Sequence, residues 1–349
     1  MHPIEHTAWE LLSRGEPFVL ALIVRHKGAT PRTAGSKMLV TRDGRGIGTI
    51  GGGLLEADVM HRAGRLIQNG RSELIQFDLT GEVVTGMDMI CGGRADVLLS
   101  CVSATPANRD LFDQWHRMLQ QNRRGCLVTV ARPIRESIYH TTHCLVKAGG
   151  KMVGRSPLAR EVMETVLSAA ESADRTQTLQ FDQTLVVLEP ATRAATAYLF
   201  GAGHVARPTS RLAAMVGFRV WVLDDREAFA NPERFPDAHQ LKVLDGFERA
   251  FEDLEVTADS YVIIFTRGHL HDRVVLALAL ATDAGYIGMI GSRHKRNAIY
   301  DALRADGIPQ SQIERVHCPI GLAIGAETPE EIAVSIVAEM ISHRSKKRP

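Results

Sequence analysis

The sequence predicts an α/β protein with two domains: an N-terminal α+β domain (residues 1–190) and a C-terminal Rossmann-like domain with a doubly wound parallel sheet (residues 195–345). Three observations support this prediction. The chain has 349 residues, a length typical of two domains. The pattern Gly201-x-Gly203-x-x-Ala206 lies between an apolar run and a helical pattern. Before this pattern most apolar runs are short and separated by turns, and after it strands and helices alternate.

The N-terminal part is expected to contain hairpins rather than βαβ units, with its motifs within residues 15–105. Asp43-Gly44 between two apolar runs predicts a hairpin. A helical period begins after Gly51-Gly52-Gly53 and ends at Gly70. The expected strands are 18–26, 37–41, 46–50, 74–78, 95–102, 126–131, 144–147 and 184–188, and the expected helices are 54–70, 108–121 and 157–173.

The rhythm changes after Ala195, and the short polar segment 189–193 is the expected domain boundary. The alternation that follows is typical of a parallel doubly wound sheet. Strands are expected at 197–200, 219–223, 241–243, 261–265, 286–290 and near 316, and helices at 205–216, 271–284, 295–306 and 329–343.

Composition argues against several classes of protein. The formal net charge is +1, which gives no indication of a nucleic-acid partner. The five cysteines, at 91, 101, 126, 144 and 318, form no C-x-x-C pair, which favours a reducing compartment. The start of the chain shows no signal peptide, and no apolar run approaches 18 residues. We therefore expect a cytoplasmic protein without a membrane partner.

The glycine pattern near residue 200 predicts a dinucleotide site. Gly201 permits a tight turn, Gly203 lets the backbone approach a pyrophosphate, and Ala206 lets helix and strand pack closely. Asp224 follows about twenty residues later, where a carboxylate can accept a ribose hydroxyl. The expected ligand is NAD(P) or another nucleotide, and Arg226 leaves a phosphorylated ribose or another anion open.

Loops after the later strands are expected at the same carboxyl edge of the sheet, where ligands bind in such folds. A glycine-serine turn that begins a helix is typical of an anion site, whereas Lys295 and Arg296 are interpreted as a solvated helix face. His269, His271 and Asp272 are interpreted as hydrogen-bonding residues more readily than as metal ligands. The further cofactor-binding candidates are His204, Asp225, Arg267, His269, Gly291, Ser292 and Arg293.

Three loops of the front domain form a second set of candidates. One is the turn-rich segment 28–36, which contains Arg32. Another is Gly51-Gly52-Gly53 with Glu56 in the following helix, where a close backbone approach to a ligand and a tight structural crossover both remain open. The third is Cys91-Gly92-Gly93, in which the glycine context favours an exposed thiolate.

Together these stretches resemble the XdhC/CoxI family. The resemblance depends on the glycine-rich loops of the front domain and on the whole run from Gly201 to Ala338. Its most specific part is Pro319-Ile320-Gly321-Leu322-x-Ile324-Gly325-Ala326-Glu327-Thr328-Pro329-Glu330-Glu331-Ile332-Ala333. The segment 105–190 contributes little to it.

The resemblance implies an accessory protein rather than a turnover enzyme. Such proteins look like carriers that bind molybdenum cofactor of the molybdopterin type, hold it during sulfuration by a cysteine desulfurase, and deliver it to an apo molybdenum hydroxylase similar to xanthine dehydrogenase. It further implies a homodimer, and Cys91 as a molybdenum ligand or sulfur relay. Many members have cysteine after the triple glycine, where this chain has Leu54.

Two other functions fit the residues less well. An NAD(P)-dependent oxidoreductase would need a proton donor beside the nicotinamide, and His204 and His269 are the candidates. A nucleotide-sensing regulatory protein would bind nucleotide without hydride transfer and without pterin.

Overall fold

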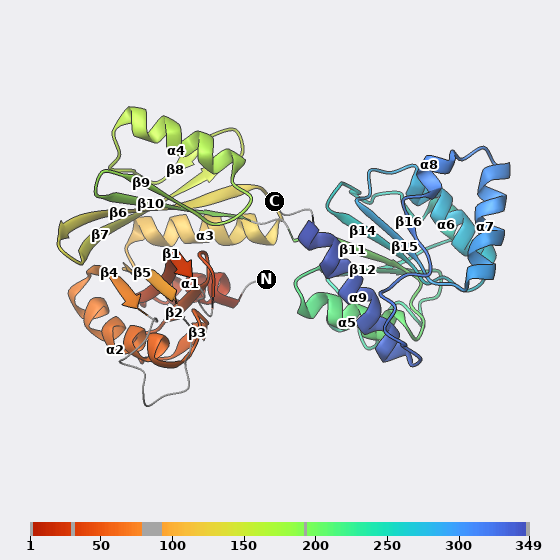
Figure 1. The fold of residues 1–349 in the computed structure, drawn as a ribbon, viewed down its shortest axis with the longest axis horizontal. Coiled ribbons are helices and arrows are strands. Elements are labelled where there is room, and N and C mark those ends of the chain that lie inside the picture. Colours follow the sequence, from red (N-terminus) through yellow and green to blue (C-terminus); the bar gives the residue numbers. More distant parts are fainter. Residues whose placement is uncertain (1–2, 29–31, 79–92, 192–193, 347–349) are drawn as a thin grey trace. The chain divides into compact units, whose positions relative to one another are not determined.

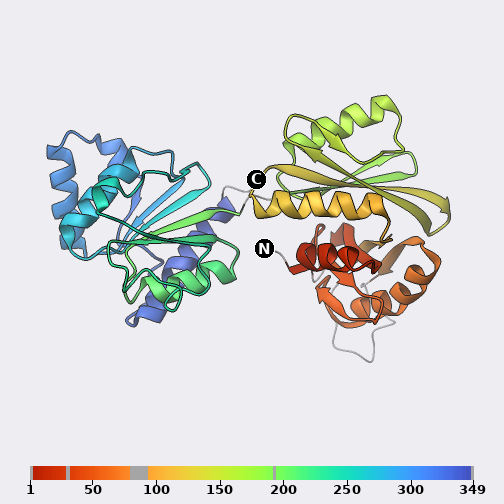
Figure 2. The same ribbon diagram turned by 180° about the vertical axis from the view of Figure 1, so that it is seen from behind.

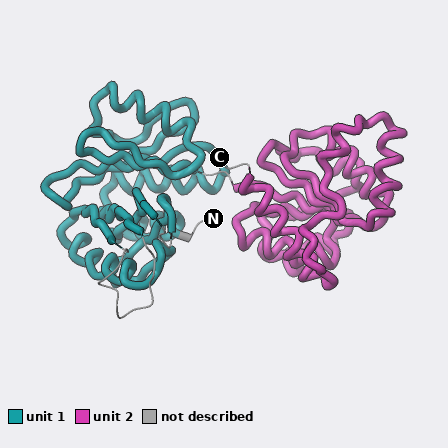
Figure 3. The backbone as a smooth tube through the Cα atoms, viewed as in Figure 1, with its two compact units in different colours: residues 1–193 teal, residues 194–349 magenta. Residues whose placement is uncertain are grey.

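The computed structural model describes residues 3–28, 32–78, 93–191 and 194–346. The chain divides into two compact units, unit 1 with residues 1–193 and unit 2 with residues 194–349 (Figure 3). Within the described residues, no helix has the length and apolar character needed to cross a membrane.

Unit 1 is built on an antiparallel sheet, which has ten strands within the described residues. Its strand order is β3-β2-β1-β5-β4-β7-β6-β10-β9, and β8 pairs with β7. The strands are β1 (Phe18–Gly28), β2 (Lys37–Val40), β3 (Gly46–Gly48), β4 (Ser72–Asp78), β5 (Gly93–Val102), β6 (Gly125–Arg135), β7 (Ile138–Lys147), β8 (Met152–Val153), β9 (Gln177–Phe181) and β10 (Thr184–Pro190). The helices are α1 (Pro3–Ser13), α2 (Gly53–Asn69), α3 (Pro106–Gln120) and α4 (Arg160–Ser172).

The helices of unit 1 cover the sheet in separate packing layers. Helix α2 packs on one face of β1, β2, β4 and β5, while α4 packs on β6, β7 and β10. Helices α1 and α3 share a core with Phe18, Leu127 and Leu145, and α3 lies between the two halves of the sheet (Figure 1). Successive side chains point to opposite faces of a strand, and the central strands such as β1 are buried continuously because both faces are covered.

The last strand in the order, β9, returns to the first long strand. The Thr178 hydroxyl in β9 donates a hydrogen bond to the Val24 carbonyl in β1 over 2.9 Å. Between these strands lies a small apolar core, which contains Leu22 of β1, Leu98 of β5 and Leu185 of β10. The sheet consequently curls, and segments far apart in sequence meet at its ends.

Unit 2 is a parallel sheet with the order β13-β12-β11-β14-β15-β16, six strands in the described part of the chain. These strands are β11 (Thr196–Phe200), β12 (Arg219–Asp224), β13 (Gln240–Val243), β14 (Ser260–Ile264), β15 (Tyr286–Met289) and β16 (Val316–His317). The helices are α5 (Ala206–Met215), α6 (His269–Leu280), α7 (Arg293–Ala305), α8 (Gln310–Ile313) and α9 (Pro329–Lys346), with a 3-10 turn η1 (Phe247–Arg249). The predicted α/β fold class is thus confirmed.

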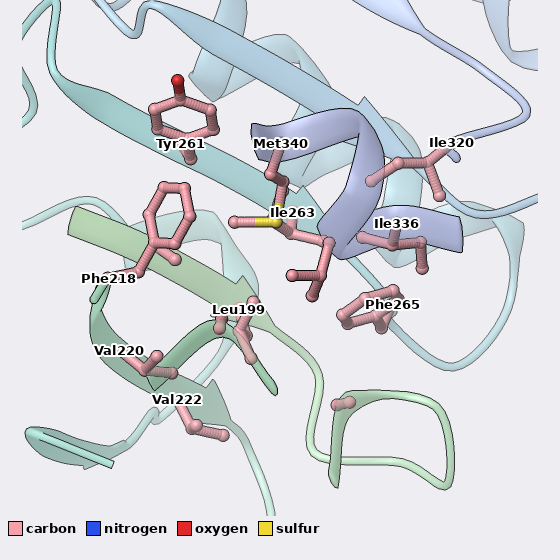
Figure 4. Close-up of a cluster of buried hydrophobic side chains, with 14 of the residues drawn as sticks. Leu199, Phe218, Val220, Val222, Tyr261, Ile263, Phe265, Ile320, Ile336 and Met340 are labelled. Carbon is pink, nitrogen blue, oxygen red and sulfur yellow. The ribbon is translucent and has the colours of Figure 1, made fainter. Parts of the chain in front are cut away.

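Helices cover both faces of this sheet, as expected for a doubly wound fold. Helices α5 and α9 pack on one face, and α6, α7 and α8 pack on the other (Figures 1 and 2). Figure 4 shows the first of these cores, in which Ile336 and Met340 of α9 lie near Ile263 and Phe265. The strand order reverses at β11, and doubly wound folds bind their ligands at the carboxyl end of the strands beside such a reversal.

Several element predictions are wrong in extent. Helix α1 and strand β9 were not predicted; β9 is short with few apolar residues, and both elements depend on contacts with distant parts of the chain. Strands β6 and β7 extend past the predicted 126–131 and 144–147 as a long hairpin with polar residues in its outer half. Helix α6 starts at His269, before the predicted residue 271, and ends at Leu280, before the predicted 284.

A buried histidine in unit 1 predicts sensitivity to mild acid. Burial lowers the pKa of His143 to about 4, while its ring nitrogens contact the hydroxyls of Thr129 and Ser100. An unfolded histidine has a pKa near 6.5, so between these values the unfolded state binds a proton that the folded state does not. We expect a loss of about 2 kcal/mol in the free energy of unfolding from pH 7.5 to pH 5.

Urea unfolding at the two pH values, followed by fluorescence of Trp9 and Trp115 in a Trp221→Phe background, measures this loss in unit 1. His143→Gln removes the titrating group and should reduce the loss. His140→Gln, at an exposed position of the same strand, should retain it. Equal losses in both variants would show that another group causes the sensitivity.

Candidate functional site

The glycine turn of unit 2 contains two glycines, and the fold itself requires glycine at only one of these positions, Gly201. Gly201 adopts φ 107°, and a Cβ atom there would lie 2.5 Å from the Phe265 carbonyl oxygen of the neighbouring segment. A Cβ atom at Gly203 would meet no atom within 4 Å, so its small size is not needed by the protein itself. Ala206 is fully buried where α5 meets the sheet. Gly203 is therefore the position where a ligand can approach the backbone.

Asp224, at the end of β12, is only 1% exposed, and both of its carboxylate oxygens accept hydrogen bonds. Its Oδ2 accepts hydrogen bonds from the Ala202 amide over 2.7 Å and from Arg226 over 3.0 Å. Its Oδ1 accepts hydrogen bonds from the amide and the Nε of Arg226 over 3.0 and 2.8 Å. Burial acts to raise the pKa of this carboxyl, but the bonds from Arg226 and Ala202 outweigh burial and lower it.

Asp225 and Arg267 connect the two strands that flank β11. Arg267, just after β14, donates to Asp225 Oδ2 over 2.5 Å. The other oxygen, Asp225 Oδ1, is buried without a hydrogen-bond partner and lies 3.8 Å from Arg226 Nε. The structure thus brings Asp224, Asp225 and Arg267 together at the carboxyl edge beside the glycine turn.

Two residues of this edge were not identified from the sequence as site residues, Phe229 and Arg234. The Arg226 guanidinium lies 3.7 Å from the Phe229 ring centroid, and the Arg234 guanidinium lies 4.9 Å from it. Arg234 also donates to the Ala202 carbonyl in the glycine turn over 3.3 Å. Both residues stand in the segment after Asp224 that supported the family resemblance, which was the available signal.

The loop after β15 forms a helix start with an adjacent charge pair. Ser292 caps α7 by accepting a hydrogen bond from the Lys295 amide, with Gly291 before it and Arg293 exposed in the first turn. Lys295 forms an ion pair with Asp272, whose carboxylate is fully buried and accepts a bond from Thr266 over 2.5 Å. Burial raises the pKa of Asp272 against the opposing effects of Lys295 and Thr266.

The prediction of a solvated helix face for Lys295 and Arg296 is therefore wrong. The Lys295 side chain is 27% exposed because it folds over Gly291 toward Asp272, and Arg296 donates to the Cys318 carbonyl. His204 and His269 are exposed at the glycine turn and at the start of α6. Within the described residues, no group of three or more His, Cys, Asp or Glu side chains could hold a metal ion.

In unit 1 the pairing of β1 with β5 brings two of the predicted loops together. Gly28, where the first loop begins, pairs with Gly93, where the third loop ends. Four exposed residues, 25–28, form this end of β1, and Lys27 lies opposite Arg94. Arg32 and Gly93 are described, whereas Cys91 and Gly92 lie outside the described residues.

The triple glycine follows β3, at a different level of the sheet from the pair Gly28 and Gly93. Strand β3 runs in the direction of β1, since both are antiparallel to β2. Gly48 pairs with Met38, which pairs with Ala21, so β3 ends level with Ala21 and not with Gly28. Glu56 Oε1 accepts bonds from the Thr49 hydroxyl and from the amides of Ile50 and Gly52, over 2.6, 3.0 and 2.8 Å. Burial acts to raise the pKa of Glu56, but these bonds lower it.

This geometry favours the structural interpretation of the triple glycine. Gly51, Gly52 and Gly53 all have positive φ, at 131°, 79° and 59°, which only glycine adopts readily. The amide of Gly51 donates to the Thr49 hydroxyl, so the loop is closed by its own residues. A Cβ atom at Gly52 would still face open space, so its outer side remains accessible.

The four described cysteines are poor thiolates. Burial raises the pKa of Cys101, Cys144 and Cys318 to about 11 and that of Cys126 to about 12. Cys101, Cys126 and Cys144 are buried among the apolar core residues of unit 1, and Cys318 is half-buried in unit 2. A thiolate is the form that ligates metals and attacks sulfur, so none of these four is prepared for either role at neutral pH.

Comparisons with known proteins agree with this arrangement. Residues 197–340 match the XdhC Rossmann domain, and residues 11–78 match the XdhC and CoxI family. The chain is 31% identical to a Bacillus subtilis protein described as a probable xanthine dehydrogenase subunit, over 96% of each chain. It is 23% identical to the molybdenum cofactor insertion chaperone PaoD of Escherichia coli, over 97% of this chain and 86% of PaoD.

One solved structure is similar over nearly the whole chain. It is a Bacillus halodurans protein described as a xanthine dehydrogenase, with a TM-score of 0.80 and 25% identity, covering 98% of this chain and 96% of that one. Both units of the fold are thus found together in that protein. On the family matches and the relative that is 31% identical, the chain belongs to the XdhC and CoxI family.

Proposed function

We propose that this protein binds molybdenum cofactor of the molybdopterin type and delivers it to an apo molybdenum hydroxylase similar to xanthine dehydrogenase. The similarity to PaoD, which is named as a molybdenum cofactor insertion chaperone, supports this proposal. The observation that carries it is the register of β1 with β5, in which Gly28 pairs with Gly93. Gly28 begins the sequence segment that contains Arg32, and Gly93 follows the segment that contains Cys91.

The chemistry of this end suits an anionic, phosphate-bearing pterin. Lys27 and Arg94 lie directly opposite each other, and like charges in that position destabilise a strand pair. Asp78 forms an ion pair with Arg94, whereas Lys27 has none within the described residues. An anionic cargo would supply the missing negative charge.

Cys91 is the proposed thiol of this site. The other four cysteines have raised pKa values, and only Cys91 stands among glycines next to a cationic strand end. During sulfuration by a cysteine desulfurase, we propose that the chain holds the cofactor through this thiol and through the cationic residues, in a homodimer.

The direct test is anaerobic purification from cells that co-express cofactor synthesis, followed by molybdenum and pterin analysis. Cys91→Ser is expected to lose most of the retained molybdenum, or to fail in activating the client hydroxylase, because the thiolate ligand is gone. Cys318→Ser is the matched control and should retain both properties. Unchanged loading and activation in Cys91→Ser would remove this thiol from the proposal.

The same preparation distinguishes the carrier function from the two other candidate functions. Bound pterin or molybdenum supports the function of a cofactor carrier. Hydride transfer to or from NAD(P) would instead support an oxidoreductase, and nucleotide binding without pterin or hydride transfer would support a sensor.

A further inference from the structure

The ribose end of the Rossmann crevice differs from that of a site for an unphosphorylated dinucleotide. In such a site, the carboxylate at the end of the second strand accepts hydrogen bonds from the ribose hydroxyls. Here Asp224 already accepts four hydrogen bonds, two on each oxygen. A carboxylate offers about four lone-pair sites, so Asp224 has none left for a ribose hydroxyl.

The side chain that occupies this carboxylate is Arg226. Its Nε and one terminal nitrogen bind the two oxygens of Asp224, and the Arg226 side chain is 29% exposed against 1% for Asp224. Arg226 thus covers Asp224 where a ribose would have to reach it. The charge of the carboxylate is also neutralised, which removes its repulsion of an anionic ligand.

Arg234 gives this end of the crevice an uncompensated positive charge. Arg226 pairs with Asp224 and Arg267 pairs with Asp225. Within the described residues Arg234 has no ion pair, and its Nε is buried without a hydrogen-bond partner. A guanidinium stays charged at all relevant pH values, so Arg234 offers an unused charged donor next to the glycine turn.

Phe229 holds both guanidiniums in place. Their distances of 3.7 and 4.9 Å from its ring centroid lie within the range of cation–π attraction. Two fixed planar guanidiniums beside a helix start suit a phosphate group, since arginine donates two parallel hydrogen bonds to phosphate oxygens.

The structure assigns Arg234, together with Arg226 and Phe229, as the group that recognises a phosphomonoester on the ribose of a bound nucleotide. The crevice of unit 2 therefore selects NADP-type nucleotides over NAD-type nucleotides. This assignment does not depend on the molybdenum cofactor, because every residue in it belongs to unit 2 and none belongs to the proposed pterin site.

The test compares two ligands that differ only in the 2′-phosphate, 2′,5′-ADP and 5′-AMP. Their affinities for the full chain, purified without cofactor synthesis, are measured by isothermal titration calorimetry. A charge-assisted hydrogen bond to phosphate corresponds to about a 10- to 100-fold gain in affinity, which is the expected advantage of 2′,5′-ADP. NADP+ should show the same advantage over NAD+.

Arg234→Gln is expected to remove most of this advantage and to leave the affinity for 5′-AMP unchanged. Arg234→Lys keeps the positive charge but lacks the planar pair of donors, so it should keep only part of the advantage, and it guards against a folding defect in the glutamine variant. Arg249→Gln removes an exposed guanidinium elsewhere in unit 2 and is the matched control.

Three results would overturn the assignment. The first is equal affinity of the wild type for 2′,5′-ADP and 5′-AMP. The second is an advantage that persists in Arg234→Gln. The third is displacement of 2′,5′-ADP by inorganic phosphate at equal concentration, which would make the site one for free phosphate. None of these results bears on molybdenum retention, so failure here and failure of the proposed function are distinguishable.

Discussion

Replacing Lys37 with methionine is expected to lower the free energy of unfolding by about 3–5 kcal/mol, the cost of removing one partner from a buried ion cluster. Lys37 Nζ lies 2.6 Å from Glu5 Oε1 and 2.9 Å from Glu189 Oε1. The two carboxylate side chains are 9% and 4% exposed, and the second oxygen of each is buried without a hydrogen-bond partner. Methionine would leave both charges buried and unpaired.

In the wild type, the two carboxylates stabilise the charged form of Lys37. Burial acts to lower the pKa of Lys37, but the charges of Glu189 and Glu5 outweigh burial and raise it above its usual range. The cluster joins α1, the start of β2 and the end of β10, so it connects three segments that are distant in sequence. Its loss should destabilise unit 1 as a whole.

Urea unfolding followed by fluorescence of Trp9 and Trp115, again with Trp221→Phe, measures the effect. Adding Glu5→Gln and Glu189→Gln should restore part of the stability by removing both charges.

Lys151→Met is the matched control, since Lys151 is exposed and its loss should change stability by less than about 0.5 kcal/mol. A loss below about 1 kcal/mol in Lys37→Met would contradict the view that the carboxylates are desolvated in the folded chain.

The Rossmann unit could be predicted from the sequence because its determinants are close together in the chain. Gly201, Gly203, Ala206 and Asp224 fall within one strand-helix-strand unit, and their residue types and spacing match the dinucleotide-binding pattern. The parallel order of the remaining strands then follows from their alternation with helices.

Contacts between polar side chains from different elements could not be predicted from the sequence. Lys295 reaches Asp272 across two helices, and Lys37 meets Glu189 from a strand 152 positions away. No pattern of apolar residues marks such pairs, because periodicity reports which face of an element is buried and not which polar groups meet. The saturation of Asp224 depends on the side-chain conformation of Arg226, which residue order alone does not determine.

In the glycine turn, Gly201→Ala and Gly203→Ala are expected to have opposite consequences. At Gly201 the new Cβ atom would lie 2.5 Å from the Phe265 carbonyl oxygen and 2.9 Å from the Thr266 nitrogen, with φ at 107°. Backbone strain and overpacking together should destabilise unit 2 by about 2–6 kcal/mol. Reduced amide hydrogen-exchange protection of β11 and β14 in Gly201→Ala, against the wild type, would measure this loss.

Gly203→Ala should instead fold normally and bind nucleotide poorly. No atom lies within 4 Å of its added Cβ atom, so thermal unfolding and hydrogen exchange should match the wild type. The methyl group would occupy the space where a pyrophosphate approaches the backbone, so the affinity for NADP+ should fall by about tenfold or more. If Gly203→Ala binds NADP+ as the wild type does, the phosphates do not lie on this turn. If instead Gly203→Ala unfolds as Gly201→Ala does, the open side of the turn has a structural role that its surroundings do not indicate.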